Sequence, residues 1–216
     1  VRDGSETPLS NQRWYDVFGI EWLKSGSGLL ISASDKVSGS NQIRILSYPQ
    51  DDARQITNDL SQYDSLSATA DGESFVSIET NTISGIYIGQ AGADTNEFEE
   101  IVSETGELQP FVWTPEGKII FRSSKDGVAN LWIMEADGGN RRQLTANAQV
   151  DSRGLCISPD GKYLVFGSWR NGKSNLWRVD ADGNGLTQLT NGDVDVYPSC
   201  SPDNLSVVYQ KGLHSV

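Results

Sequence analysis

The residues of this sequence with the clearest capacity for chemistry are carboxylates at recurring positions. Each stands five or six residues before the same position in a short apolar segment that recurs along the sequence. The four carboxylates are Asp16, Glu107, Asp151 and Asp195. If the segments lie side by side around a hub, these carboxylates form a ring at the mouth of a channel, and such a ring concentrates cations. The alternative, which we favour, is that each carboxylate accepts backbone N–H groups and caps its own loop.

Aromatic side chains that could stack on a sugar or a peptide occur near the same segments. Four of them fall in or beside predicted loops and are our candidate contact residues. They are Trp14, Tyr15, Trp169 and Tyr197. A further pair, Trp132 and Trp177, shares one position of a repeat described below, so we expect that pair to pack inside the fold.

The scarcity of histidine restricts catalysis. His214 is the only histidine, so one chain cannot assemble a Ser-His-Asp, Cys-His or multi-histidine metal site. Segment 180–185 has the first half of a calcium-loop pattern, but Asn191 stands where a bidentate Glu is needed. The remaining enzymatic alternative is a glycoside-active protein that uses paired carboxylates. We predict a protein that is not an enzyme and that holds no metal or cofactor.

The balance of charges limits the class of partner. The chain has 17 Lys and Arg against 29 Asp and Glu, and a surface with a net charge of −12 repels phosphate backbones and anionic lipids. No apolar run approaches the roughly 18 to 20 residues that span a bilayer. We therefore expect neither nucleic-acid nor membrane binding. Cys156 and Cys200 are expected to be buried free thiols.

A repeat runs through the sequence and must position these residues. Its clearest mark is a turn, Ser-Pro-Asp-Gly-Lys at 158–162, that precedes a short apolar run. The matching turn residues are Gly26, Gly72, Gly117, Gly161 and Asn204, which are 46, 45, 44 and 43 residues apart. Recurrence at this period is typical of a supersecondary unit that is stacked several times.

Each repeat is predicted to form four short antiparallel strands. In the clearest copy we expect strands over 155–157, 163–167, 176–179 and 187–189, separated by turn-forming residues. The second strands are nearly continuous in apolar residues, which is typical of strands covered on both faces. Four strands in each unit of about 40 to 45 residues indicate an all-β fold, a β-propeller with nearly no helix.

The chain is predicted to be a single β-propeller domain over 1–216, with four whole blades and parts of a fifth. The whole blades are expected over 20–57, 66–102, 111–145 and 155–190, with the last strand of a blade over 1–10 and the start of a blade over 197–216. Two arrangements remain open. Either the two ends complete a closed five-bladed ring, or the chain is a segment of a larger propeller.

The repeat resembles the Pro-Asp-Gly repeat of TolB-like β-propellers. The resemblance is carried by Pro159-Asp160-Gly161, Asn175-Leu176-Trp177 and Gln188-Leu189-Thr190, and it covers most of the chain. It implies a recognition or sensor module, periplasmic or extracellular, that binds a protein or peptide, with carbohydrate as a further candidate.

Similar propellers are attached as sensors to bacterial serine/threonine kinases and are also found in some peptidases. This chain has neither kinase motifs nor a Gly-x-Ser-x-Gly elbow, so the resemblance implies no catalysis.

Overall fold

In the computed structural model, all regular structure in the described part of the chain is β-strand. The described residues are 6, 8–35, 40–59, 61–69, 71, 73–90 and 98–212. They belong to two compact units, Val1–Asn81 and Thr82–Val216, and each unit is described by itself. The predicted all-β class is confirmed. No described segment of the chain forms a helix that could span a bilayer.

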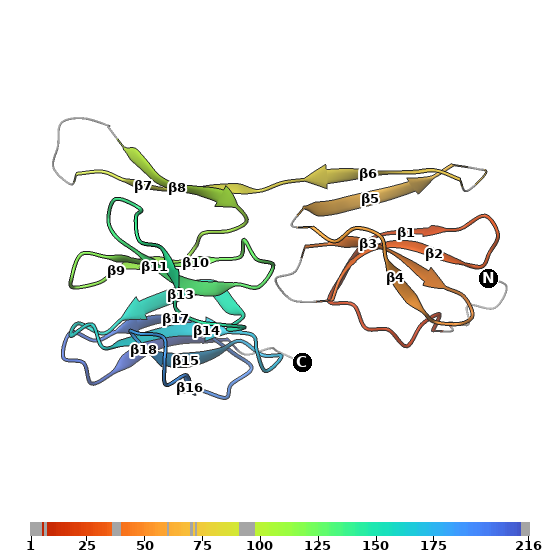
Figure 1. The fold of residues 1–216 in the computed structure, drawn as a ribbon. Helices are drawn as coiled ribbons and strands as arrows, with labels where there is room; N and C mark the ends of the chain where they lie inside the picture. Colours follow the sequence, from red (N-terminus) through yellow and green to blue (C-terminus); the bar gives the residue numbers. More distant parts are fainter. Residues whose placement is uncertain are drawn as a thin grey trace. The chain divides into compact units, whose positions relative to one another are not determined.

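The first unit contains one four-stranded sheet and one hairpin. Strands β1 (Asp16–Trp22), β2 (Gly28–Ser34), β3 (Gln42–Ser47) and β4 (Ala53–Gln55) form an antiparallel sheet in sequence order (Figure 1). Strands β5 (Gln62–Ala68) and β6 (Phe75–Thr80) form the hairpin. Strand β2 is buried along its whole length, because its apolar residues make the core of this sheet with β3.

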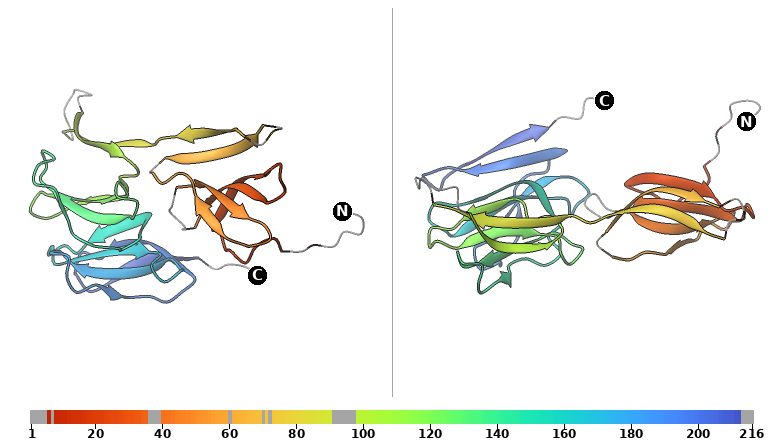
Figure 2. Two further views of the ribbon diagram at one scale, coloured as in Figure 1. Left: turned by 45° about the vertical axis from the view of Figure 1, so that its right-hand side comes forward. Right: turned by 90° about the horizontal axis from the view of Figure 1, so that it is seen from above.

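The second unit contains two four-stranded sheets, with a hairpin before them and a hairpin after them in the sequence (Figure 2). Strands β7 (Ile83–Ile88) and β8 (Glu99–Thr105) form the first hairpin. The first sheet contains β9 (Phe111–Trp113), β10 (Ile119–Ser123), β11 (Asn130–Met134) and β12 (Arg142–Gln143). The second sheet contains β13 (Val150–Ile157), β14 (Tyr163–Ser168), β15 (Asn175–Asp180) and β16 (Thr187–Gln188). Strands β17 (Val194–Cys200) and β18 (Val207–Gly212) form the last hairpin.

The Pro-Asp-Gly turn has the chemistry that the sequence predicts. Between β13 and β14, the Asp160 carboxylate accepts a hydrogen bond from Lys162 N at 3.2 Å, and Gly161 has the left-handed φ of 72°. Between β17 and β18, Asp203 accepts from Leu205 N at 3.0 Å, and Asn204 takes the glycine position with φ 64°. The turns that connect β13 to β14 and β17 to β18 are therefore stabilised by the same local hydrogen bond.

A threonine hydroxyl joins the third and fourth strands of every four-stranded sheet in the described chain. Its oxygen accepts a hydrogen bond from a backbone N–H of the third strand. The three pairs are Ile43 N to Thr57 Oγ1 at 2.9 Å, Leu131 N to Thr145 Oγ1 at 3.0 Å and Leu176 N to Thr190 Oγ1 at 3.0 Å. This bond explains why a Gln-apolar-Thr sequence recurs about a dozen residues after each third strand.

Consecutive repeats are joined by a backbone hydrogen bond inside each unit. The residue before the third strand accepts from the first strand of the next repeat. The three bonds are Tyr63 N to Asn41 O at 3.1 Å, Val150 N to Ala129 O at 3.0 Å and Asp195 N to Ser174 O at 2.8 Å. Neighbouring sheets within a unit are therefore laid side by side, as the blade prediction requires, while ring closure and blade number stay predictions.

The second strands make the core of the complete sheets. Ile120 of β10 belongs to one core cluster and its neighbour Phe121, on the other face of the strand, belongs to another, which confirms burial on both faces. The successive residues Leu164, Val165 and Phe166 of β14 are likewise buried. The expectation is wrong for the hairpins, since Val76 of β6 and Val208 of β18 are each 70% exposed. In the described chain these two strands have one strand partner each instead of two.

The repeat expected over 66–102 forms four strands, but they pair as two separate hairpins. One hairpin, β5–β6, belongs to the first unit, and the other, β7–β8, belongs to the second. The single domain over 1–216 and the blade boundaries stay predictions. Most of the segment 1–10, Gly72, His214 and the last residues of 197–216 lie outside the described residues.

The expectation of free thiols is wrong. Cys156 of β13 and Cys200 of β17 form a disulfide, with a Cα–Cα distance of 5.8 Å. Their sequence separation of 44 residues is one repeat period, so the first strands of two neighbouring repeats bring them together. The bond ties the β17–β18 hairpin to the sheet before it.

Candidate functional site

The four predicted carboxylates are divided between the two units. Asp16 begins β1 in the first unit, where it is exposed and accepts a hydrogen bond from Val17 N at 3.2 Å. The other three, Glu107, Asp151 and Asp195, belong to the second unit. Only Glu107 lies in a connection, because Asp151 and Asp195 are already the second residues of β13 and β17. Three of the four carboxylates therefore belong to strands, and one lies in a connection.

Asp151 is buried at the start of β13 and is surrounded by donors. Arg153 donates from Nε at 3.0 Å and from its NH2 group at 2.6 Å, and Ser174 Oγ donates at 2.6 Å. Burial by itself raises the pKa of Asp151, but the hydrogen bonds from Arg153 and Ser174 outweigh it and hold the pKa below its usual value. The carboxylate is therefore ionised at neutral pH, with both oxygens engaged.

A buried arginine connects Glu107 to the same region. Arg122 of β10 is 2% exposed; its Nε donates to the Val150 carbonyl at 2.8 Å, and its NH1 group donates to Glu107 Oε2 at 2.9 Å. Burial lowers the pKa of Arg122, and the charge of Glu107 opposes that shift. Glu107 thus serves as the counter-ion of a buried guanidinium, and the charge of Asp151 adds a weaker attraction.

Asp195 does not occupy the position of Asp151 in the repeat. It makes the backbone bond to the preceding sheet that Val150 makes in β13, and it lies opposite Lys211 as Val150 lies opposite Ser168. The sequence spacing missed this because the irregular pairing between Val150 and Leu155 of β13 contains more residues than the one between Val196 and Ser199 of β17. Asp195 is 1% exposed, its Oδ2 accepts from Gly192 N at 3.0 Å, and its Oδ1 has no hydrogen-bond partner in the described structure.

The two predicted aromatic residues of the second unit are Trp169 and Tyr197. Trp169 follows β14 and is half-buried, and the Arg153 guanidinium lies 5.1 Å from the centre of its ring. Tyr197 of β17 is 53% exposed and has φ 55°. Its backbone passes so close to Gly154 of β13 that a Cβ on Gly154 would lie 2.9 Å from Tyr197 Cα.

We call these eight residues the β13–β17 cluster: Glu107, Arg122, Asp151, Arg153, Trp169, Ser174, Asp195 and Tyr197.

The aromatic candidates of the first unit have different surroundings. Trp14 is half-buried against the core of the β1–β4 sheet, and Arg44 lies 5.0 Å from its ring centre. Tyr15 is 56% exposed and is held in place by a bond from its backbone N–H to the Ser34 carbonyl at 2.8 Å. Of this pair, Tyr15 is thus the residue that presents a ring to solvent.

The two tryptophans expected inside the fold do pack against it. Trp132 and Trp177 each contact a core cluster, and each ring is covered by a cation, Lys125 at 3.8 Å and Arg170 at 4.9 Å from the ring centres. Both rings are only partly buried, and a cation at the same position of the repeat covers each of them.

Sequence reasoning missed three members of the cluster: Arg122, Arg153 and Ser174. Arg122 could have been found, because a charged residue inside the apolar strand Ile119–Ser123 requires a buried partner. Arg153 stands two residues after Asp151 on the same strand, where side chains share one face. No feature of the sequence marked Ser174.

Two carboxylates of the cluster are paired with guanidinium groups. The Arg153 NH2 group lies 2.6 Å from Asp151 Oδ2, and the Arg122 NH1 group lies 2.9 Å from Glu107 Oε2. The described residues contain no group of three or more His, Cys, Asp or Glu side chains that could hold a metal. In the former calcium-loop candidate, Asp182 accepts from Asn184 N at 2.9 Å, as in an ordinary hairpin turn.

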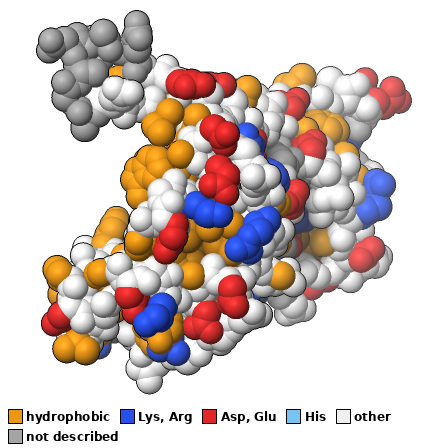
Figure 3. Space-filling model, turned by 60° about the vertical axis from the view of Figure 1, so that its left-hand side comes forward, with side chains coloured by type: hydrophobic (Ala, Val, Ile, Leu, Met, Phe, Trp, Pro, Cys, Tyr) orange, Lys and Arg blue, Asp and Glu red, His pale blue; other side chains and the backbone are white. Residues whose placement is uncertain are grey.

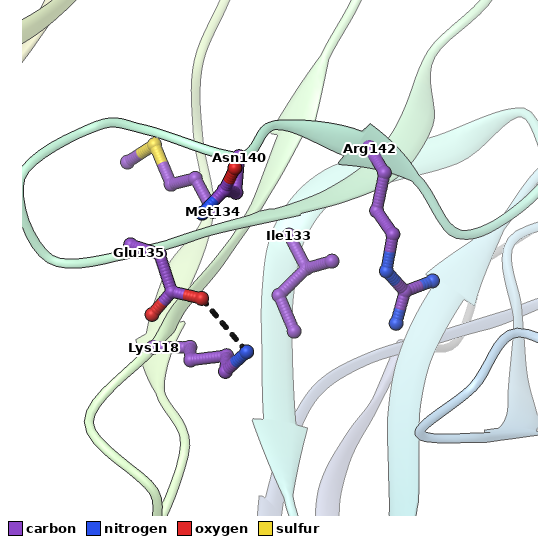
Figure 4. A pocket seen from close by; sticks show the side chains of 6 residues that line it. All are labelled: Lys118, Ile133, Met134, Glu135, Asn140 and Arg142. Carbon is purple, nitrogen blue, oxygen red and sulfur yellow. Dashed lines mark hydrogen bonds and ion pairs between the residues drawn. The ribbon is translucent and has the colours of Figure 1, made fainter.

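A separate hollow lies between the β9–β10 turn and the β11–β12 hairpin. Its volume is about 230 Å³, and its lining includes Lys118, Glu135 and Arg142 (Figure 4). Lys118 Nζ binds Glu135 Oε1 at 2.8 Å across its floor. No member of the β13–β17 cluster lines it.

Figure 3 shows one face of the molecule, on which acidic and basic side chains are interspersed with exposed apolar ones.

Repeated four-stranded meanders laid side by side, with charged and aromatic residues at the start of the first strands, define a β-propeller-type repeat protein. Residues 82–215, more than half of the 216 residues, match the family model of the TolB beta propeller domain. The chain therefore belongs to the TolB β-propeller family. A search of curated proteins finds no significant match.

Solved structures of TolB proteins are similar to the chain. TolB from Acinetobacter baumannii matches with a TM-score of 0.50 and 18% identity over 92% of this chain and 49% of that chain. A structure described as TolB from Agrobacterium tumefaciens matches with a TM-score of 0.43 and 20% identity over 90% of this chain and 69% of that chain. A structure of a nidogen–laminin complex matches with a TM-score of 0.39 and 12% identity over 90% of this chain and 56% of that chain. The chain thus spans about half of the Acinetobacter protein.

Proposed function

We propose that this TolB-like propeller is a non-catalytic recognition or sensor module that binds a protein or peptide through the β13–β17 cluster. One observation carries the proposal. The Arg153 guanidinium lies over the Trp169 ring, the backbone of the exposed Tyr197 passes close to Gly154, and the carboxylates Asp151 and Glu107 are each paired with an arginine of the protein. Aromatic and arginine side chains of this kind are the residue types that dominate binding energy at interfaces.

The proposed location is periplasmic or extracellular. The Cys156–Cys200 disulfide supports it, because disulfides persist in oxidising compartments and are rare in a reducing cytosol. The family supports the same location, since the TolB protein that gives it its name is periplasmic. A propeller that senses a ligand for an attached kinase is one form that such a module takes.

The proposal is tested with a peptide selected from a displayed random 12-residue library against the whole chain. Tyr197→Ala is expected to weaken binding of the selected peptide about 30-fold. This is the loss of affinity expected for an interface residue that contributes about 2 kcal/mol of binding free energy. The matched control is Phe98→Ala, since Phe98 is 69% exposed and lies outside the cluster. Equal losses in the two variants would contradict the proposed binding site.

The glycoside-active alternative is tested on the same protein with a panel of aryl glycosides. A hydrolase would lose activity by orders of magnitude in Asp151→Asn or Glu107→Gln. The proposal predicts no turnover above a boiled control. Turnover that both substitutions abolish would replace the recognition module with an enzyme.

A further inference from the structure

The hollow between the β9–β10 turn and the β11–β12 hairpin has a positive balance of charge. Its lining contains two cations, Lys118 and Arg142, and one carboxylate, Glu135. Lys118 Nζ donates to Glu135 Oε1 at 2.8 Å, so these two charges compensate each other. The charge that remains is that of Arg142. In a chain with a net charge of −12, such a hollow is an unusual place that favours a single anionic group.

Two consecutive arginines precede and begin β12, and they have different surroundings. Arg141 donates from Nε to the Gly138 carbonyl at 3.0 Å and from its NH2 group to the Ile101 carbonyl at 3.1 Å. Consecutive side chains of an extended segment point to opposite sides, so Arg142 points away from these acceptors. Among the described residues, the Arg142 guanidinium has no hydrogen-bond or ion-pair partner, and Figure 4 shows it apart from the Lys118–Glu135 pair.

The carboxylate of Asp182 is affected by the charge of Arg142 without binding it. Asp182 Oδ1 accepts from Asn184 N at 2.9 Å, and Oδ2 accepts from Asn184 Nδ2 at 3.0 Å. These hydrogen bonds lower the pKa of Asp182, and the charge of Arg142 lowers it further. Asp182 is thus held within its own turn, and the donors of the Arg142 guanidinium stay available to a ligand.

Apolar side chains complete the lining of the hollow. Ile133 and Met134 are 9% and 1% exposed, so they form its floor, while Arg142 lies opposite Ile133 in the pairing of β11 with β12 and is exposed. The volume of about 230 Å³ is smaller than the roughly 300 Å³ or more of a pocket for a drug-sized ligand, so the hollow suits one functional group of a larger molecule. A carboxylate on a short methylene stem matches this lining, because a guanidinium can bind a carboxylate with two parallel hydrogen bonds.

We propose that this hollow binds a carboxylate group of a partner peptide through the guanidinium of Arg142. The carboxylate comes from an acidic side chain or from the end of the peptide chain. A carboxylate carries one negative charge and balances the uncompensated charge of the hollow, whereas a phosphate monoester carries nearly two. The site is independent of the recognition proposed above, since no member of the β13–β17 cluster lines the hollow.

The test is an NMR titration of the whole chain with three short alanine peptides, followed at the Arg142 Nε–Hε and Ile133 methyl signals. The first peptide has blocked ends and a central Glu, the second has a free terminal carboxylate and no Glu, and the third has blocked ends and a central Gln. A saturable shift with a Kd of about 1 mM is expected for at least one carboxylate peptide, and the Gln peptide is expected to bind at least about tenfold more weakly. The first two peptides distinguish a side-chain carboxylate from a terminal one.

Arg142→Gln is expected to weaken binding of the carboxylate peptide at least about tenfold, because it removes the guanidinium from an exposed position. The matched control is Arg54→Gln, since Arg54 is exposed and lies opposite Ile45 in the pairing of β3 with β4, as Arg142 lies opposite Ile133. This control should leave the affinity unchanged. Unchanged amide signals of the core strand β14 show that each variant is folded.

Three results would overturn the proposal. They are equal binding of the Gln peptide, equal losses in Arg142→Gln and Arg54→Gln, and no saturable shift at any peptide concentration up to about 20-fold above the expected Kd. Tyr197→Ala separates this proposal from the function proposed above, because it removes a ring of the cluster and leaves the hollow intact. Carboxylate binding that persists in Tyr197→Ala supports the hollow whatever the outcome for the cluster.

Discussion

Removal of the Cys156–Cys200 disulfide is expected to destabilise the second unit by at most about 4 kcal/mol. The bond closes a loop defined by a sequence separation of 44 residues. The chain-entropy relation for a loop of that length gives about 4 kcal/mol near 25 °C, and residual structure in the unfolded chain reduces the effect toward about 2 kcal/mol. The loss arises in the unfolded chain, so the strands of the β13–β16 sheet should remain folded at low denaturant.

The assay is urea unfolding of the double variant Cys156→Ser/Cys200→Ser. Amide exchange of Leu164 and Phe166 is the readout, because both lie in the core of the second unit and report its opening separately from the first unit. Reduced wild type is the matched control and should equal the variant. The reasoning is refuted if oxidised wild type and variant have the same stability, or if the unreduced chain titrates two free thiols.

Three further predictions concern the repeat and the cluster. Phe166→Ala should cost about 3 to 5 kcal/mol of unfolding free energy, because its ring is fully buried, and a loss below about 1 kcal/mol would show that the core is elsewhere. Gly183→Ala should lower the unfolding free energy more than Gly172→Ala does. Both glycines have a positive φ, but only at Gly183 would a Cβ lie 2.1 Å from the Leu144 carbonyl oxygen. Equal effects of the two substitutions would contradict that packing. The lowered pKa of Asp151 predicts a contribution to stability that is present above about pH 4 and is lost as the pH falls through the pKa of the folded state. Asp151→Asn should remove this part of the acid dependence in unfolding curves measured from pH 7 to 2.

The strand plan could be predicted because turn chemistry and apolar patterning act locally. The turn at 158–162 and the run after it predicted a strand over 163–167, and β14 covers Tyr163–Ser168. The strand before it was expected over 155–157, but β13 begins at Val150, because its pairing with β14 is irregular between Val150 and Leu155. Irregular pairing depends on which side chains are buried between sheets, and the sequence pattern of one strand does not contain that information.

The cluster could be predicted only in part because its contacts join residues that are far apart in the sequence. The carboxylate positions came from sequence spacing, but Ser174 is 23 residues from Asp151 and Arg122 is 15 residues from Glu107, so only the folded sheets bring these partners together. The longer irregular segment of β13 relative to that of β17 shifted Asp195 away from its expected equivalent. The disulfide, in contrast, could have been inferred from the repeat, since its 44-residue separation equals one period.

The most direct test of the account is the site at which a bound partner touches the chain. A photo-reactive phenylalanine analogue is placed at position 197 in one preparation and at position 98 in another, and each is irradiated with the library-selected peptide. Recognition through the β13–β17 cluster predicts a cross-link from position 197 that unlabelled peptide suppresses, with none from position 98. A cross-link from position 98 alone, or equal cross-links from both, would contradict it.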